Sequence, residues 1–257
     1  MWVVEAGCTD CTGGGPSFDR KASSTFQLAT RDPTGDPTLL EITYGSGTVV
    51  GDLVQDTVAM GGFRVPNQPW LLADLYPTYL LEGSCSGSMG LAFDTIARTE
   101  SIPFWQTLAD SGQLTTPEMS FWFTRLLGDL DAQGEGFGGV FTLGGRNKTL
   151  YTGDVEFLPL VTNVGRETYW LLNVSGMFPI HACLVLGFPH TRVSIPGITV
   201  NKKNVTLPSG GTAAVDTGTT LISGPAAAVS AIYAQIPNSQ PLDGSLAGYY
   251  GFRMSVS

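Results

Sequence analysis

One acidic residue lies in a stretch that could use it for chemistry. Segment 213–225 reads AAVDTGTTLISGP and places the carboxylate of Asp216 in a tight turn between two apolar runs. The small and apolar residues predict a buried strand, and apolar walls would raise the cost of ionising the acid. Thr217, Gly218 and Thr219 offer hydroxyls and backbone N–H groups that can orient a carboxylate. Such a turn suits a catalytic acid, although an isolated Asp-Thr-Gly triplet more often only closes an Asx-turn.

A second motif is a hairpin framed by glycines at residues 39–52. Apolar and polar residues alternate with a period of two on both sides of its tip, as expected of two paired strands. The tip carries Tyr44, followed by Gly45 and Ser46. In an arbitrary hairpin such a tyrosine is ordinarily a cross-strand packing residue. Packing is therefore the default interpretation of Tyr44 when the hairpin is considered alone.

The rest of the chain predicts short strands and a few short helices. Helices are expected at 103–109 and 225–233, each opened by a proline. Asp110-Ser111-Gly112 follows the first helix with no apolar strand before it, so we interpret it as a cap and stop signal. The acidic, glycine-rich segment 128–138 predicts a turn. Strands are expected at 2–5, 57–60, 70–72, 87–93, 119–123, 139–145, 169–175 and 213–215.

Composition sets the class of protein. A chain of 257 residues, 42% hydrophobic and 14% charged, can bury a sizeable core, and its 33 glycines and 16 prolines favour many strands joined by turns. The net charge of −9 and the scattered Lys and Arg residues argue against nucleic-acid binding. No apolar run is long enough to span a membrane, and Met1 leads into Trp2 without a signal peptide.

The four cysteines do not have the pattern of a zinc site. Cys8 and Cys11 form a C-x-x-C pair, but a zinc site needs a second pair, and Cys85 and Cys183 are isolated. A glycine-rich stretch rather than a helix follows Cys11, which argues against a thioredoxin-like role. A small structural disulfide loop is the favoured interpretation, and we expect no metal and no cofactor. Three sequons, at Asn147, Asn173 and Asn204, are compatible with secretion but also arise by chance.

These motifs, in this order, resemble the pepsin-like aspartic peptidases, of the fungal type. The resemblance covers most of the chain and rests on 214–220 as the second catalytic motif, 42–47 as the flap, 90–93 as an N-lobe core strand and 169–170 as the opening of the C-lobe. It implies a mainly β, bilobal fold with a peptide-binding cleft between the lobes. The N-terminal lobe would comprise residues 1–157 and a partial C-terminal lobe residues 158–257.

The resemblance also implies roles for individual residues. Asp216 would be one of two catalytic acids that activate a water molecule, since of two close carboxylates only one ionises and each can then take a different role. Substrate would contact the flap and the acid turn, and other residues would support them. The substrate-binding set is Tyr44, Gly45, Ser46, Gly218 and Thr219; the supporting set is Trp2, Thr217 and Thr220; and Cys8 and Cys11 would form a disulfide.

The chain departs from the family pattern in two ways. The first Asp-Thr-Gly would precede Trp2 by a few residues and so fall upstream of Met1, and the chain stops before the rest of the C-lobe. We therefore expect a chain truncated at both ends and inactive alone. Segment 177–197 has no counterpart in the pattern; it is either an intron translated in frame or a real surface loop, which costs little entropy.

The sequence thus predicts an aspartic endopeptidase by family, acting on polypeptides. It would be a monomer that binds neither nucleic acid nor membrane, and it would be secreted or vacuolar by resemblance, with no signal peptide in this chain. Two alternatives remain: a relative that binds peptides without catalysis, and a defective gene model that does not fold stably because losing a central strand exposes sheet edges and core.

Overall fold

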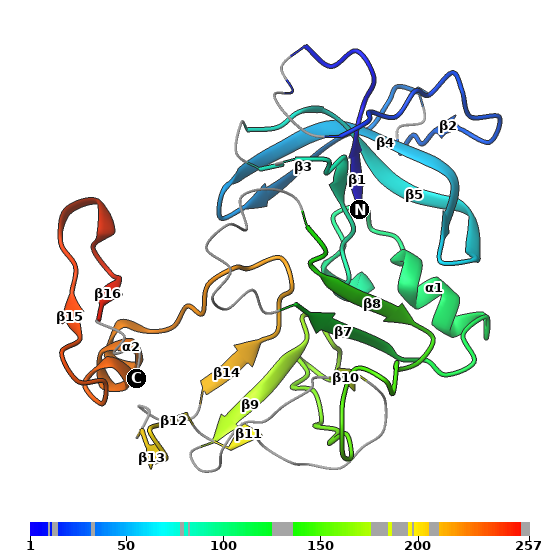
Figure 1. The fold of residues 1–257 in the computed structure, drawn as a ribbon. Coiled ribbons are helices and arrows are strands. Elements are labelled where there is room, and N and C mark those ends of the chain that lie inside the picture. The colour runs from blue at the N-terminus through cyan, green and yellow to red at the C-terminus, as the bar shows by residue number, and fades with distance from the viewer. Residues whose placement is uncertain are drawn as a thin grey trace. The chain divides into compact units, whose positions relative to one another are not determined.

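The computed structural model describes most of the chain. The described residues are 1–9, 11, 15–31, 34–77, 80–81, 83–124, 136–175, 185–186, 195–196, 198–205 and 211–252. The chain is mainly β, as predicted, and divides into two compact units, Met1–Leu150 and Tyr151–Ser257 (Figure 1). The division falls slightly before the boundary expected at 157. Most of the segments 128–138 and 177–197 lies outside the described residues.

Unit 1 is built on a six-stranded sheet with the order β2-β4-β5-β1-β6, in which β3 also pairs with β4. The long antiparallel pair β4 and β5 turns at Gly61 and Gly62, which both have positive φ, a conformation that glycine adopts at little cost. β1 runs parallel to β5 and antiparallel to β6. The strands are β1 (Trp2–Val4), β2 (Gln27–Leu28), β3 (Leu39–Tyr44), β4 (Gly47–Met60), β5 (Phe63–Leu75) and β6 (Gly87–Ser88).

The strand predicted at 87–93 is much shorter than expected. Only β6 forms, because its partner β1 has three residues and pairs with β6 through Trp2 and Val3. Phe93, which follows, is buried and contacts a helix instead of forming a strand. The ring of Phe93 meets that of Trp105 edge to face, with centroids 5.3 Å apart, and Trp105 Nε1 donates to the Ala92 carbonyl at 3.1 Å.

Helix α1 (Phe104–Asp110) begins after Pro103 and ends at Ser111, followed by Gly112 with a φ of +70°. Both the helix and the stop signal at 110–112 are as predicted. A short 3-10 helix, η1 (Asp94–Ile96), precedes α1, and β7 (Met119–Phe123) pairs antiparallel with β8 (Gly139–Leu143) beyond it. The buried side chains of α1 are Phe104, Trp105 and Leu108.

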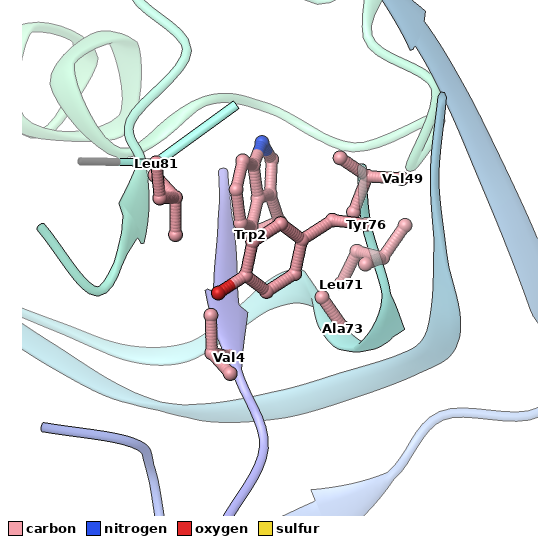
Figure 2. Close-up of a cluster of buried hydrophobic side chains, with 7 residues drawn as sticks. All are labelled: Trp2, Val4, Val49, Leu71, Ala73, Tyr76 and Leu81. Atoms are coloured by element: carbon pink, nitrogen blue, oxygen red, sulfur yellow. The ribbon is translucent and has the colours of Figure 1, made fainter. Parts of the chain in front are cut away.

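Unit 1 contains a cluster of buried hydrophobic side chains, the Trp2 cluster (Figure 2). The Trp2 side chain is 1% exposed, and its ring lies 5.9 Å from that of Tyr76. Leu40 and Ile42 of the hairpin and both cysteines of the C-x-x-C pair pack against the cluster from outside, so two sequence motifs share one support. Its members are Trp2, Val4, Val49, Leu71, Ala73, Tyr76 and Leu81.

Unit 2 contains a three-stranded sheet in which β9 (Leu171–Ser175) lies between parallel β11 (Ile195–Pro196) and antiparallel β14 (Gly211–Ala214). Helix α2 (Ala226–Tyr233) begins after Pro225, as predicted. Tyr233 stacks on Tyr250 with centroids 4.4 Å apart, which joins the helix to the β15–β16 hairpin. The other elements are β10 (Val185–Leu186), β12 (Thr199–Val200), β13 (Lys203–Asn204), β15 (Gln240–Pro241), η2 (Gly244–Leu246) and β16 (Tyr250–Gly251).

A buried carboxylate in β4 links the sheet to the loop before β2. Asp56 is 4% exposed and accepts hydrogen bonds from the Thr25 hydroxyl and, at 2.6 Å, from the Thr57 N–H. Burial alone would raise the pKa of Asp56, but hydrogen bonds from Thr25, Ser23 and Thr57 outweigh it and lower the pKa. The folded state therefore favours the ionised form of this acid.

We expect Asp56→Asn to make unit 1 less stable at neutral pH but not in strong acid. Because the folded pKa is below the unfolded value of about 3.9, the ionised group contributes stability above that value. The contribution is lost as the pH falls through the folded pKa. Urea midpoints of both proteins, measured between neutral and strongly acidic pH, should converge toward acid; a gap that stays constant at every pH would contradict this reasoning.

Candidate active site

The predicted hairpin forms from β3 and β4, with Gly45 and Ser46 as its tip. The strands pair from Leu39 with Asp52 to Tyr44 with Gly47. Gly47 has a φ of +141°, and a Cβ there would lie 2.2 Å from the Pro77 side chain, so the tip requires glycine at this position. The sequence did not single out Pro77. Gly45 and Ser46 are both exposed at the tip.

Tyr44 is held by a hydrogen bond to the core. The indole Nε1 of Trp2 donates to the Tyr44 hydroxyl oxygen at 2.9 Å, while the tyrosine side chain remains 37% exposed. Burial around the hydroxyl raises the pKa of Tyr44, and the Trp2 bond opposes this only in part. The hydroxyl therefore keeps its proton and can donate a hydrogen bond to another group.

Cys8 and Cys11 form a disulfide, with Cα atoms 5.5 Å apart. The Cys8 sulfur lies 2.8 Å from the Asp74 carbonyl oxygen, and both cysteines pack against the Trp2 cluster. The small loop is thus fixed on the same buried support as the hairpin. Cys85 is an exposed free thiol, and Cys183 lies outside the described residues.

In unit 2, a turn after β14 holds the Asp216 carboxylate at both oxygens. The Val215 N–H donates to the carbonyl of Trp170, the residue before β9, at 3.0 Å, which ties down the chain just before the acid. The Gly218 N–H donates to Oδ1 at 2.8 Å, and the Thr219 hydroxyl donates to Oδ2 at 2.6 Å. A Cβ at Gly218 would lie only 3.2 Å from Oδ1, so glycine permits this approach. The turn orients the acid.

The prediction of a buried strand with apolar walls around Asp216 is wrong for this structure. Residues 216–220 are exposed, as are three of the four residues of β14, and Leu221 and Ile222 are 56% and 102% exposed. A strand does form just before the acid, but the apolar residues of the sequence do not show which segment would cover them. β14 pairs with β9 on one edge, and no strand among the described residues pairs with its other edge.

Comparison with known proteins identifies the family. A model of the eukaryotic aspartyl proteases matches residues 1–247. The chain belongs to this family. The pepsin-like resemblance of the sequence motifs is therefore confirmed.

Three curated relatives of this aspartyl protease chain show how far the similarity extends. It is 34% identical over 258 residues to "Major aspartyl peptidase 1" of Cryptococcus neoformans var. grubii, covering 98% of the chain and 47% of the relative. It is 27% identical over 248 residues to "Pepsin A" of Sus scrofa, covering 96% and 54%. It is 30% identical over 242 residues to "Vacuolar protease A" of Arthroderma otae, covering 93% and 51%. The chain spans about half the length of these relatives.

The structure brings the predicted residues of the aspartyl protease chain together in two separate groups. In unit 1, Trp2 and Tyr44 are bonded. In unit 2, Asp216 is bonded to Gly218 and Thr219. Two further predicted residues of unit 2, Thr217 and Thr220, are exposed and form no hydrogen bond to Asp216 within the described part of the chain.

Across the described residues, no group of three or more His, Cys, Asp and Glu side chains is placed to hold a metal ion. In the same part of the chain, no helix combines the length and the apolar character that a bilayer span requires.

The sequence pattern does not predict a charged group that lies at the base of the hairpin formed by β3 and β4. The pairing of β4 with β5 shifts between Val50 and Gly51, which leaves Asp74 as an extra residue on β5. Arg20 pairs with Glu5 and lies 4.0 Å from Asp52. Burial is the main cause that raises the pKa of Asp52; Asp74 and Glu5 raise it further, and Arg20 opposes them.

We expect Asp52→Asn to stabilise unit 1 at neutral pH and to change little in acid. An acid with a raised folded pKa contributes its stability below the unfolded value of about 3.9 and loses it as the pH rises through the folded pKa. Replacing Asp52 therefore increases the stability of unit 1 only at pH values above the folded pKa, where the wild-type carboxylate is ionised. This pH trend is opposite to the one expected for Asp56→Asn, so urea midpoints of the two variants measured together provide an internal control. A destabilised Asp52→Asn protein at neutral pH would contradict it.

Proposed function

We propose that Asp216 is one of the two catalytic acids of an endopeptidase that acts on polypeptides in acid. The observation that carries the proposal is the bonding of its carboxylate, at 2.8 Å by the Gly218 N–H and at 2.6 Å by the Thr219 hydroxyl. Fixing both oxygens removes the rotation that a free carboxylate would retain. An exposed acid held in this way can approach a substrate or a water molecule.

The chemistry requires a second acid. Of two close carboxylates, one keeps a proton while the other is ionised, because two negative charges at that distance repel each other. The ionised acid takes a proton from the attacking water, the protonated acid donates to the carbonyl oxygen, and a proton then passes to the leaving amine. The 257 residues contain Asp-Thr-Gly once. The similar triplet Asp110-Ser111-Gly112 lies at the C-terminal end of α1.

The flap supplies the other proposed contacts. Tyr44 presents a hydroxyl that is oriented by Trp2 and can donate to a substrate carbonyl. Gly45 and Ser46 expose backbone groups that an extended polypeptide could bond. Gly218 and Thr219 would contact substrate beside Asp216, with Thr217 and Thr220 supporting that turn. The substrate class is polypeptide, and we propose a monomer.

The chain alone is expected to have no peptidase turnover, because it offers one acid for a two-acid mechanism. The test is hydrolysis of an unfolded protein by the purified chain at acid pH, followed by electrophoresis. We expect intact substrate. Acid-dependent cleavage that is inhibited by pepstatin and abolished in Asp216→Asn would overturn the proposed inactivity while supporting the role of the acid.

A relative that binds peptides without cleaving them is the second candidate, and the single Asp-Thr-Gly favours it. In that case peptide affinity should depend on Tyr44 and be unchanged by Asp216→Asn, which isothermal titration with an extended peptide would measure. For location, we propose a secreted or vacuolar protein. The names of two relatives, "Pepsin A" and "Vacuolar protease A", support those two alternatives.

A further inference from the structure

The turn after β8 contains an exposed sequon whose side chains are already bonded to each other. Asn147, Lys148 and Thr149 are all exposed. The Asn147 Oδ1 accepts hydrogen bonds from the Thr149 hydroxyl at 2.7 Å and from the Thr149 N–H at 3.1 Å. The Asn147 carbonyl accepts from the Leu150 N–H at 3.1 Å, which closes the turn. Oδ1 is thus occupied, whereas Nδ2 of this exposed residue forms no hydrogen bond to any described residue.

Residues 144–146, just before the asparagine, anchor this turn. Arg146 Nε lies 2.9 Å from a carboxylate oxygen of Glu118, and the Gly144 N–H donates to the Glu118 carbonyl at 2.8 Å. The Ser120 hydroxyl donates to the Gly145 carbonyl at 3.3 Å. These contacts fix residues 144–146 to the start of β7. A large group on Asn147 would therefore extend into solvent without displacing a packed side chain.

The sequon at Asn173 has a different environment. Asn173 lies in the middle of β9, opposite Thr212 of β14, and the next residue of β9 pairs with β11 on its other side. Because β9 is the central strand of its sheet, its backbone groups are committed to the two ladders. The chain there cannot also form the turn seen at Asn147. The third sequon, at Asn204, ends at Thr206, outside the described residues.

We propose that Asn147 carries an N-linked oligosaccharide and that Asn173 does not. The donor would be an oligosaccharide on a lipid diphosphate, with a transferase as catalyst. Nδ2 of Asn147 forms a bond to the anomeric carbon, the bond from that carbon to the diphosphate oxygen breaks, Nδ2 loses one proton, and the lipid diphosphate leaves. The two hydrogen bonds from Thr149 to Oδ1 draw electron density toward that oxygen and make the Nδ2 protons more acidic, which assists the loss of the proton in this step.

The inference rests on the secreted or vacuolar location proposed above, because the transfer occurs in the secretory pathway. The experiment must therefore direct the chain into the secretory pathway. A cleavable leader placed before Met1 directs the full chain into the secretory pathway of yeast, and Asn204→Gln removes the third sequon from every protein compared. Both secreted and cell-retained chains are digested with peptide N-glycosidase, which converts a glycosylated asparagine to aspartate. Mass spectrometry of the peptides then shows whether each site carries asparagine or aspartate.

We expect aspartate at position 147 after the enzyme treatment and unmodified Asn173. Asn147→Gln and Thr149→Val should each lose the glycosidase-sensitive shift in gel mobility, whereas Thr149→Ser should keep it because a serine hydroxyl can still donate to Oδ1. Asn173→Gln should leave the shift unchanged. An unmodified Asn147, or a glycan on Asn173, would overturn the inference. Neither result depends on peptide hydrolysis, so the proposed peptidase function would stand.

Discussion

Replacing Trp2 by alanine is expected to lower the free energy of unfolding of unit 1 by roughly 3–5 kcal/mol. The side chain is 1% exposed and belongs to β1, which lies between β5 and β6. Its removal would leave a cavity among Val49, Leu71 and Tyr76 that neighbouring strands cannot readily fill. Urea unfolding followed by circular dichroism measures the loss. The wild-type protein should first show a single cooperative transition for this unit.

Tyr44→Phe is the matched control for Trp2→Ala. It removes the acceptor of the Trp2 hydrogen bond and keeps both rings, so we expect a cost of about 0.5–1.5 kcal/mol. The difference between the two variants isolates the packing of Trp2 from its polar contact. Equal losses in both variants would show that Trp2 supports the β3–β4 hairpin through the hydrogen bond alone. A wild-type chain without a cooperative transition would favour the alternative that this chain does not fold stably.

In any form of the protein that has a partner acid, Asp216→Asn is expected to lower kcat/KM by at least about 10²- to 10⁴-fold, the usual contribution of an acid or base. Asparagine keeps the size of the side chain and can accept the Gly218 and Thr219 bonds at one oxygen only. It cannot take a proton from water. Initial rates on a fluorogenic peptide, measured across acid pH, give the comparison. A variant with more than a tenth of the parent rate would contradict a catalytic role.

Thr219 provides a graded control for the same experiment. Thr219→Val loses the hydroxyl that lies 2.6 Å from Oδ2, and losing one hydrogen bond to a charged group should reduce the rate by about 10- to 100-fold. Thr219→Ser retains the donor and should stay close to the parent. If the valine and serine variants were equally slow, the methyl group rather than the hydroxyl would be the important part of Thr219.

Local sequence patterns predict the elements that depend on near neighbours. The hairpin at 39–52 follows from alternation around its glycines, and α1 and α2 follow from a leading proline and, for α1, a trailing glycine. The two bonds to the Asp216 carboxylate could also be anticipated, because the donors are two and three residues away. In these cases the interaction and the residues that specify it lie in one short stretch.

Features that depend on distant segments were not predictable in the same way. The strand expected at 87–93 is limited by the length of β1, and the apolar residues after Asp216 give no indication of what packs on them. The charged group at the base of the β3–β4 hairpin joins residues 5, 20, 52 and 74, and Asp74 belongs to it at a point where the pairing of β4 with β5 shifts register. Such juxtapositions require strand pairing to be known first.

The central claim is that Asp216 is one half of a catalytic pair whose partner is not among these 257 residues. The most direct measurement compares three proteins for acid-dependent peptidase activity: the chain itself, the chain with an Asp-Thr-Gly strand from a relative joined a few residues before Trp2, and the same fusion carrying Asn-Thr-Gly. We predict activity only in the Asp-Thr-Gly fusion and its loss in Asp216→Asn. Equal activity in all three proteins, or activity that survives Asp216→Asn, would contradict the claim.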